Sequence, residues 1–126
     1  MRDTGAFRVP VSVENPARRG SLRALDNVLV DTGSDLTWIP RQVLQDLGIT
    51  AERRYRFVTA TGDIVEREIG FAIVHVEGMA TADDVVFAEE EDLILLGARS
   101  LEGLNLRVDP VARRLVGGGP IVAAVA

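Results

Sequence analysis

The chain contains no cysteine and only one histidine, His75. Without cysteine there can be no disulfides and no thiolate metal sites. His75 has no partners at the spacing of metal ligands, so we interpret it as a surface strand residue rather than a ligand or a base. The sequence also has no phosphate-binding glycine loop and no Ser-His-Asp arrangement. It therefore predicts neither a metal nor a cofactor.

Long apolar runs and long basic runs are also missing. No run approaches the roughly 20 apolar residues of a membrane span, and residues 1–8 lack the apolar core of a signal peptide. Arginines cluster only in pairs, and the net charge of −5 would repel a phosphate backbone. We therefore expect a soluble, cytoplasmic protein with no membrane partner and no nucleic-acid partner.

The size of the chain favours one domain. It has 126 residues, of which 47% are hydrophobic, which is enough for one core but short for two. No internal repeat is present. We predict a single domain over residues 1–126 that ends in a glycine-rich link and an apolar tail at residues 117–126.

The most informative segment is an apolar run that ends in Asp31-Thr32-Gly33-Ser34. Residues 28–30 predict a buried strand, so the Asp31 carboxylate would lie at its end, where the glycine lets the backbone turn sharply. Either this carboxylate is positioned for chemistry, or Asp31 is a turn residue that closes a strand. A second Asp-Thr-Gly at residues 3–5 has no apolar strand before it, and we interpret it as a coincidence.

Period-two alternation of apolar residues predicts a chain made mostly of β-strands. We expect strands at residues 7–13, 22–30, 36–39, 55–60, 64–76, 83–88, 93–96 and 104–108, the last paired with residues 115–116. Pro10 confines the first strand to a sheet edge or an irregular pairing. Turns are expected at residues 61–63 and 77–80, and a solvated acidic loop at residues 89–92.

Two short helices are expected between the strands. Pro40 suits a first helical position and Gly48 suits the position after a helix, which predicts a helix at residues 40–47. A second helix of one or two turns should cover residues 98–102 and end at Gly103.

The segment Asp31-Thr32-Gly33-Ser34 resembles the active-site loop of aspartic proteases, with Trp38 and Pro40 at the spacing of the pepsin-like members. The apolar residues 93–96 before Gly97 resemble a landmark of the retropepsin-like members, and the length of the chain with one credible Asp-Thr-Gly also points to these. These form the single-lobe, retroviral-type family, and the resemblance runs from about residue 22 to residue 116. It implies an all-β, closed or nearly closed acid-protease barrel with one or two short helices, assembled as a homodimer. It also implies an aspartic endopeptidase that acts on a peptide or protein substrate without a cofactor.

The resemblance also implies roles for individual residues. Asp31 of each of two subunits would form the catalytic dyad, with one carboxylate as the base for a water and its twin as the acid. Thr32 would bond across the dyad, Gly33 would help to hold the carboxylates coplanar, and the Ser34 hydroxyl would donate to the ionised carboxylate. The hairpin that follows would be a flap over the substrate, with its turn at Ala60, Thr61, Gly62 and Asp63. Gly97 would lie beneath the catalytic loop.

Three alternatives stay open at this point. Trp38 is either a core residue or a residue beneath the flap that supports it. Residues 121–125 either join residues 7–13 in the dimer interface or form a disordered tail. The chain as a whole is either the protease or a non-catalytic dimeric peptide-binding module. Burying two carboxylates face to face is costly, which argues against a module that only binds.

Overall fold

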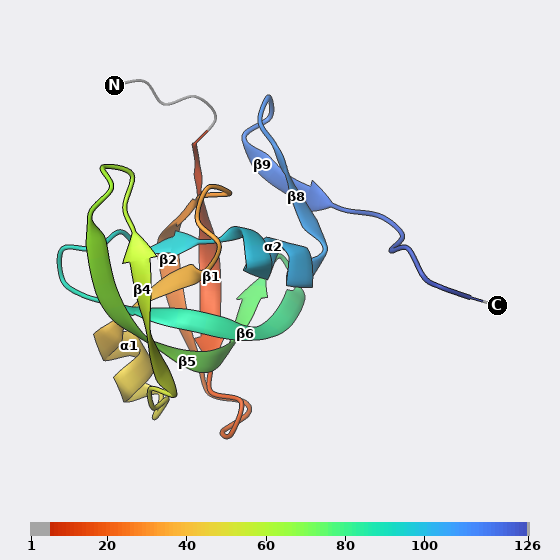
Figure 1. The fold of residues 1–126 in the computed structure, drawn as a ribbon. Coiled ribbons are helices and arrows are strands. Elements are labelled where there is room, and N and C mark those ends of the chain that lie inside the picture. Colours follow the sequence, from red (N-terminus) through yellow and green to blue (C-terminus); the bar gives the residue numbers. More distant parts are fainter. Residues whose placement is uncertain (1–5, 126) are drawn as a thin grey trace.

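The computed structural model describes residues 6–125 and shows a mostly β protein with two short helices, as predicted (Figure 1). The Asp-Thr-Gly at residues 3–5 lies outside the described residues. The helices are α1 (Arg41–Asp46) and α2 (Ala98–Leu104). The strands are β1 (Arg8–Glu14), β2 (Leu22–Val30), β3 (Thr37–Pro40), β4 (Arg53–Val58), β5 (Ile64–Val76), β6 (Met79–Ala88), β7 (Leu95–Leu96), β8 (Leu106–Asp109) and β9 (Arg114–Gly117).

Seven strands form one sheet in the order β1-β2-β7-β3-β6-β5-β4, and β1 also pairs with β5. The extra pairing closes a ring of six strands, and β4 is attached outside the ring through its ladder with β5. The pairs β2–β7 and β3–β6 are parallel. Because β7 lies between β2 and β3, the segment after β7 meets the loop that joins β2 to β3.

The first strand is not an edge strand, which corrects one of the two placements expected from Pro10. β1 pairs with β2, and its residues 12–14 also pair with residues 73–75 of β5. The β1–β2 register shifts between Val9 and Val11, so Pro10 lies in an irregularity of the ladder. This was the other expected placement, and it suits a residue that has no N–H to donate.

The core lies inside the ring, because each strand turns alternate apolar residues inward. In β1 these residues are Val9, Val11 and Val13, and all three are buried. Helix α1 adds Val43 and Leu44 to the same cluster, and α2 adds Leu101 and Leu104. The amphipathic spacing that predicted a helix after Pro40 is therefore confirmed, with the helix itself beginning at Arg41.

Several predicted boundaries are wrong: residues 59–60, 93–94 and 104–105 lie outside the strands expected there, and two further shifts have a clear physical cause. Residues 79–80 belong to β6 rather than to a turn, because Glu77 and Gly78 alone turn the chain, with φ of 55° and 80°. Helix α2 continues through Gly103, and Asn105 takes the left-handed position at its end. A side chain on residue 103 would collide with Thr81, so the glycine there permits close packing against β6.

The acidic residues 89–92 are not simply solvated, which corrects that prediction in part. Glu90 and Glu91 are exposed. However, the Asp92 carboxylate accepts hydrogen bonds of 2.7 and 2.8 Å from Arg67, and Glu89 accepts bonds of 3.1 and 2.8 Å from Arg41. Arginines from β5 and α1 therefore fix this loop against the sheet.

His75 lies half-buried on β5, in the strand where the sequence placed it. Its Nε2 is 2.8 Å from Oε1 of Glu14, so the imidazole joins β5 to the end of β1. The buried Glu14 carboxylate also accepts the backbone N–H of Gly20. These bonds lower the pKa of Glu14 from its ordinary value of 4.5 to about 2, with Gly20 as the largest cause and His75 next.

Strands β8 and β9 form a separate hairpin, which confirms that residues 115–116 pair with the preceding strand. Beyond β9 the chain runs away from the ring without regular structure (Figure 1). Ile121 and Val122 in this tail are 78% and 97% exposed. Within residues 6–125, neither helix is long and apolar enough to cross a membrane.

Candidate active site

Asp31 stands directly after β2, at the start of the loop that leads to β3. The Asp31 N–H donates to the Leu96 carbonyl at 3.0 Å, which fastens the start of the loop to β7. The Gly33 N–H donates to Oδ1 of Asp31 at 2.9 Å, and the Ser34 N–H donates to the Asp31 carbonyl at 3.2 Å. The loop therefore holds a half-buried carboxylate in one orientation. Such a group can accept a proton from a bound water.

The loop rests on the segment after β7. The N–H groups of Ala98 and Arg99 donate to the carbonyls of Ser34 and Asp35 at 2.8 and 2.9 Å. A Cβ on residue 97 would collide with the Leu36 carbonyl and would lie 2.9 Å from the Ser34 carbonyl oxygen. Only glycine allows this approach of two backbones. Gly97 therefore lies against the Asp-Thr-Gly loop, in the place that the family resemblance implied.

A buried chain of hydroxyl groups links this segment to β6. The Gly97 N–H donates to Oγ1 of Thr37 at 3.0 Å, and Thr37 lies 2.6 Å from Oγ of Ser100. The Ser100 hydroxyl then donates to Oδ2 of Asp83 at 3.0 Å. Since an N–H can only donate and an ionised carboxylate can only accept, every hydroxyl in the chain points toward Asp83. Burial is the main influence on the Asp83 carboxyl and raises its pKa.

The Ser34 hydroxyl has a different acceptor from the one expected. It donates to the Leu36 carbonyl at 2.9 Å, so it stabilises the loop itself and does not donate to the Asp31 carboxylate. Thr32, the next residue of the loop after Asp31, is exposed. Together with Asp31 it borders a depression of about 290 Å³, whose other lining residues are Ala6, Phe7, Val30, Val108 and Pro110.

The predicted flap is the hairpin of β4 and β5. Its turn closes through bonds from the Thr59 N–H to the Asp63 carbonyl at 2.8 Å and from the Gly62 N–H to the Thr59 carbonyl at 2.9 Å. Gly62 has a φ of +90°, which favours glycine. The four turn residues Ala60, Thr61, Gly62 and Asp63 are all exposed.

A cleft of about 520 Å³ separates β4 from the Asp-Thr-Gly loop. Gly33, Ser34 and Trp38 line one side of the cleft, and residues 55–58 of β4 line the other. The four flap-turn residues are not part of this lining. The Trp38 ring lies 5.2 Å from the Phe57 ring, in a small cluster with Leu36, Ile69 and Val86. Trp38 thus belongs to a satellite core and contacts Phe57 of β4, while its role in supporting a flap stays a prediction.

Sequence reasoning missed Thr37, Ser100, Asp83 and Arg99. Thr37 and Ser100 are 63 residues apart, and no local pattern in the sequence signals that they meet. Among residues 6–125 no three or more His, Asp or Glu side chains are grouped so that they could hold a metal ion.

Comparison with known proteins identifies the class. The family model described as aspartyl protease matches residues 9–100, which include the Asp31 loop, the β4–β5 hairpin and Gly97. The chain therefore belongs to the aspartyl protease family, which confirms the resemblance at that level. Among solved structures, the chain is similar to the solution structure of the simian foamy virus protease, at 19% identity and a TM-score of 0.48. That match covers 74% of this chain and 91% of the viral one. No curated protein matches the chain.

Proposed function

We propose that this protein is an aspartic endopeptidase whose active site forms between two copies of the chain. The observation that carries the proposal is the Asp31 loop, in which a half-buried carboxylate is fixed by Gly33 and by β7 in a chain of the aspartyl protease family. In this proposal the ring of six strands is one lobe of an acid-protease barrel. The second lobe is a copy of the same chain.

Two copies are needed because the reaction requires two carboxyl groups. One Asp31 carboxylate takes a proton from water while the water oxygen attacks the peptide carbonyl carbon. The other Asp31, still protonated, gives its proton to the carbonyl oxygen. Proton transfer to the peptide nitrogen then lets the C–N bond break. Two carboxyl groups this close share one proton, a property well known for the dyad of aspartic proteases, because two like charges at such a distance cannot both ionise.

The side of the loop that carries Thr32 supports this arrangement. Thr32 is exposed and lies next to the half-buried Asp31, beside a depression of about 290 Å³. In a twofold dimer the same patch of each copy would meet the other, so Thr32 would reach the partner loop as the resemblance implies. The catalytic residue is then Asp31, with Thr32 and Gly33 as dyad-supporting residues.

The direct test compares Asp31→Asn with Asp3→Asn on a mixture of peptides, with products read by mass spectrometry. We expect Asp31→Asn to abolish cleavage and to retain the melting temperature of the parent, because the amide keeps the size of the carboxylate. Asp3→Asn should cleave normally. Loss of cleavage in Asp3→Asn alone would move the catalytic site to the other Asp-Thr-Gly. Peptide binding without any cleavage by the parent protein would instead favour the non-catalytic module.

A mixing experiment tests the shared site. If each active site needs Asp31 from two chains, then a ninefold excess of Asp31→Asn chains captures most parent chains in inactive pairs. Activity per parent chain should fall about tenfold after subunit exchange, since random pairing leaves about one parent chain in ten with an intact partner. An excess of Asp31→Asn that leaves the activity unchanged would show that one chain carries a complete site.

A further inference from the structure

We propose that Arg99 is a specificity-determining residue and that the cleft selects peptides with an acidic side chain next to an apolar or aromatic one. This inference rests on the proposed function, because it takes the cleft beside the Asp-Thr-Gly loop as the place where the substrate lies; Gly33 and Ser34 of that loop line the cleft, whereas Asp31 borders the neighbouring depression. The inference starts from the lining of the cleft between β4 and the Asp-Thr-Gly loop.

The lining combines an apolar wall with an excess of positive charge. Its apolar members are Leu36, Trp38, Tyr55, Phe57 and Val58. Tyr55 and Val58 are 44% and 71% exposed, so they offer apolar surface that a substrate side chain can cover. The charged members are two arginines, Arg56 and Arg99, and one acidic residue, Asp35. A peptide that matches this lining carries an apolar group and a negative charge.

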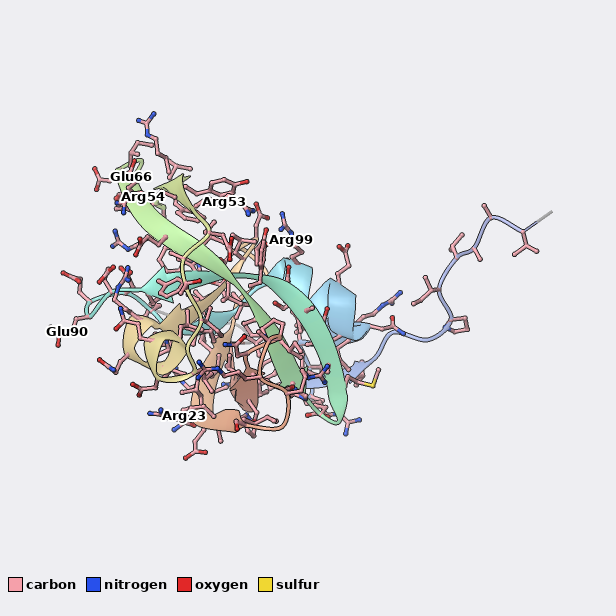
Figure 2. The ribbon with its side chains drawn as sticks, turned by 90° about the horizontal axis from the view of Figure 1, so that it is seen from below. Arg23, Arg53, Arg54, Glu66, Glu90 and Arg99 are labelled. Atoms are coloured by element: carbon pink, nitrogen blue, oxygen red, sulfur yellow. The ribbon has the colours of Figure 1, made fainter. Side chains whose placement is uncertain are left out.

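Of the two arginines that line the cleft, Arg99 is the one whose position is better defined. Its backbone N–H is bonded to the Asp35 carbonyl, so the residue is attached to the Asp-Thr-Gly loop itself. Its side chain makes one ion pair, from Nη1 to Oδ2 of Asp84 at 3.2 Å, and is 53% exposed. Arg53 binds the same Asp84 oxygen more closely, at 2.7 Å. In Figure 2 the labelled side chains of Arg53 and Arg99 lie on the same side of the β4–β5 hairpin.

The chemistry of the guanidinium group defines the ligand. The group has five N–H donors in a planar fork and no acceptor, and Arg99 uses one donor on a carboxylate that it shares with Arg53. The remaining donors match the two oxygens of a second carboxylate. A basic substrate side chain would be repelled, and a neutral one would leave these donors to water.

The test measures the preference for a Glu over a Gln side chain in the substrate, which requires a residue that binds the negative charge. A peptide mixture randomised around one apolar residue is first captured on Asp31→Asn protein, and the bound peptides show which position accepts Glu. Two peptides that differ only by Glu or Gln at that position are then compared. We expect the parent protein to favour the Glu peptide about fivefold in kcat/KM, as for a half-exposed ion pair. Arg99→Gln should bring the ratio close to one, and Arg99→Glu should favour a Lys peptide.

Arg23→Gln is the matched control. Arg23 is 48% exposed and makes one ion pair of 3.2 Å, to Asp46, and Figure 2 shows it at the opposite end of the molecule from Arg99. This variant should keep the parent ratio. Equal cleavage of the Glu and Gln peptides by the parent, or an unchanged ratio in Arg99→Gln, overturns the proposal.

The same pair of peptides separates this inference from the proposed function. Binding of fluorescent Glu and Gln peptides to Asp31→Asn protein reports the preference without cleavage. If the parent cleaves neither peptide but Asp31→Asn protein still prefers Glu through Arg99, the endopeptidase proposal fails and the specificity of the cleft stands. Equal binding of the two peptides to Asp31→Asn protein rejects the role of Arg99, whatever the catalytic result.

Discussion

At the scale of single residues, Gly97 sets the distance between two backbones. The loop that carries Asp31 lies directly on the segment after β7, and no side chain fits between them. The geometry of the Asp31 loop therefore depends on a residue that has no side-chain chemistry of its own. Its substitution should affect stability and activity together.

We predict that Gly97→Ala lowers the free energy of unfolding by about 1–3 kcal/mol, because the added methyl group pushes against the Leu36 and Ser34 carbonyls. Cleavage should fall more than stability explains, since the displaced loop carries Asp31. Denaturant unfolding and peptide cleavage measure the two effects. Gly117→Ala is the control, because a Cβ there meets nothing within 4 Å. Parent-like activity in folded Gly97→Ala protein would contradict the prediction.

The hydroxyl chain from Thr37 to Asp83 gives a second prediction at this scale. Ser100→Ala leaves the Thr37 hydroxyl without its acceptor and Asp83 without its Ser100 donor, in a buried place. The free energy of unfolding should fall by about 1–3 kcal/mol. The control is Ser21→Ala at an exposed position, which should change it by less than about 0.5 kcal/mol. Chemical denaturation measures both free energies of unfolding, and equal values for the two variants would contradict the stabilising role of the hydroxyl chain.

The sequence predicted some of these residues and not others, for a physical reason. Asp31, Gly33 and Gly97 stand next to apolar strands, and their local pattern shows the turn or close approach that each requires. The acceptor of Ser34 could not be predicted, because two acceptors, the Asp31 carboxylate and the Leu36 carbonyl, both lie within a short stretch of loop. Thr37, Ser100 and Asp83 meet only after the sheet has formed.

At the scale of elements, the Glu14 side chain adds a contact with His75 to the backbone pairing of β1 with β5. Its carboxylate accepts the Gly20 N–H from the following loop and lies against His75 of β5. Strand alternation predicted both strands, but it contains no information about which strands pair across 61 residues. A closed or nearly closed sheet was implied by the resemblance, but the β1–β5 pairing that closes the ring, and with it the failure of the edge assignment for β1, came only from the structure.

The low pKa of Glu14 predicts a loss of stability in acid. As the pH falls from 4.5 toward about 2, the unfolded chain takes up a proton at Glu14 and the folded chain does not, so folding becomes less favourable. Above pH 4.5 this contribution is fully present. In Glu14→Gln the decline over this interval should be shallower, whereas Glu52→Gln, at an exposed position, should follow the parent. Urea unfolding at a series of pH values measures this, and parallel curves for all three proteins would contradict it.

At the scale of the whole molecule, the tail after β9 is a segment that contributes no strand to the ring. Its apolar side chains are exposed in the single chain, as are parts of the cleft and flap. The resemblance of the Asp31 loop to aspartic proteases predicted a dimer, and that stays a prediction for this single chain. Sedimentation of the full chain and of a shortened chain addresses it directly.

We predict that truncation at Gly117 weakens dimerisation. The first strand is already paired with β2 and β5 inside its own ring, which leaves the exposed residues 121–125 as the chain end that would form the interface. The shortened chain should therefore dissociate at concentrations where the full chain stays dimeric, and lose cleavage with it. Analytical ultracentrifugation and a cleavage assay over a dilution series provide the measurement. An unchanged sedimentation profile with unchanged activity would remove the tail from the interface and leave Asp31 as the catalytic residue.

The unequal pairing of β5 divides this strand into two parts that should open at different rates. Residues 64–68 pair with β4 alone, whereas residues 70–76 pair with β6, and residues 73–75 also with β1. Amide hydrogen exchange should therefore be fast in the outer part and slow in the inner part, with the change near Ile69. Uniform protection along β5 would contradict this. On this prediction the outer part of the β4–β5 hairpin would open and close as a small unit of its own while the ring beneath Asp31 stays folded.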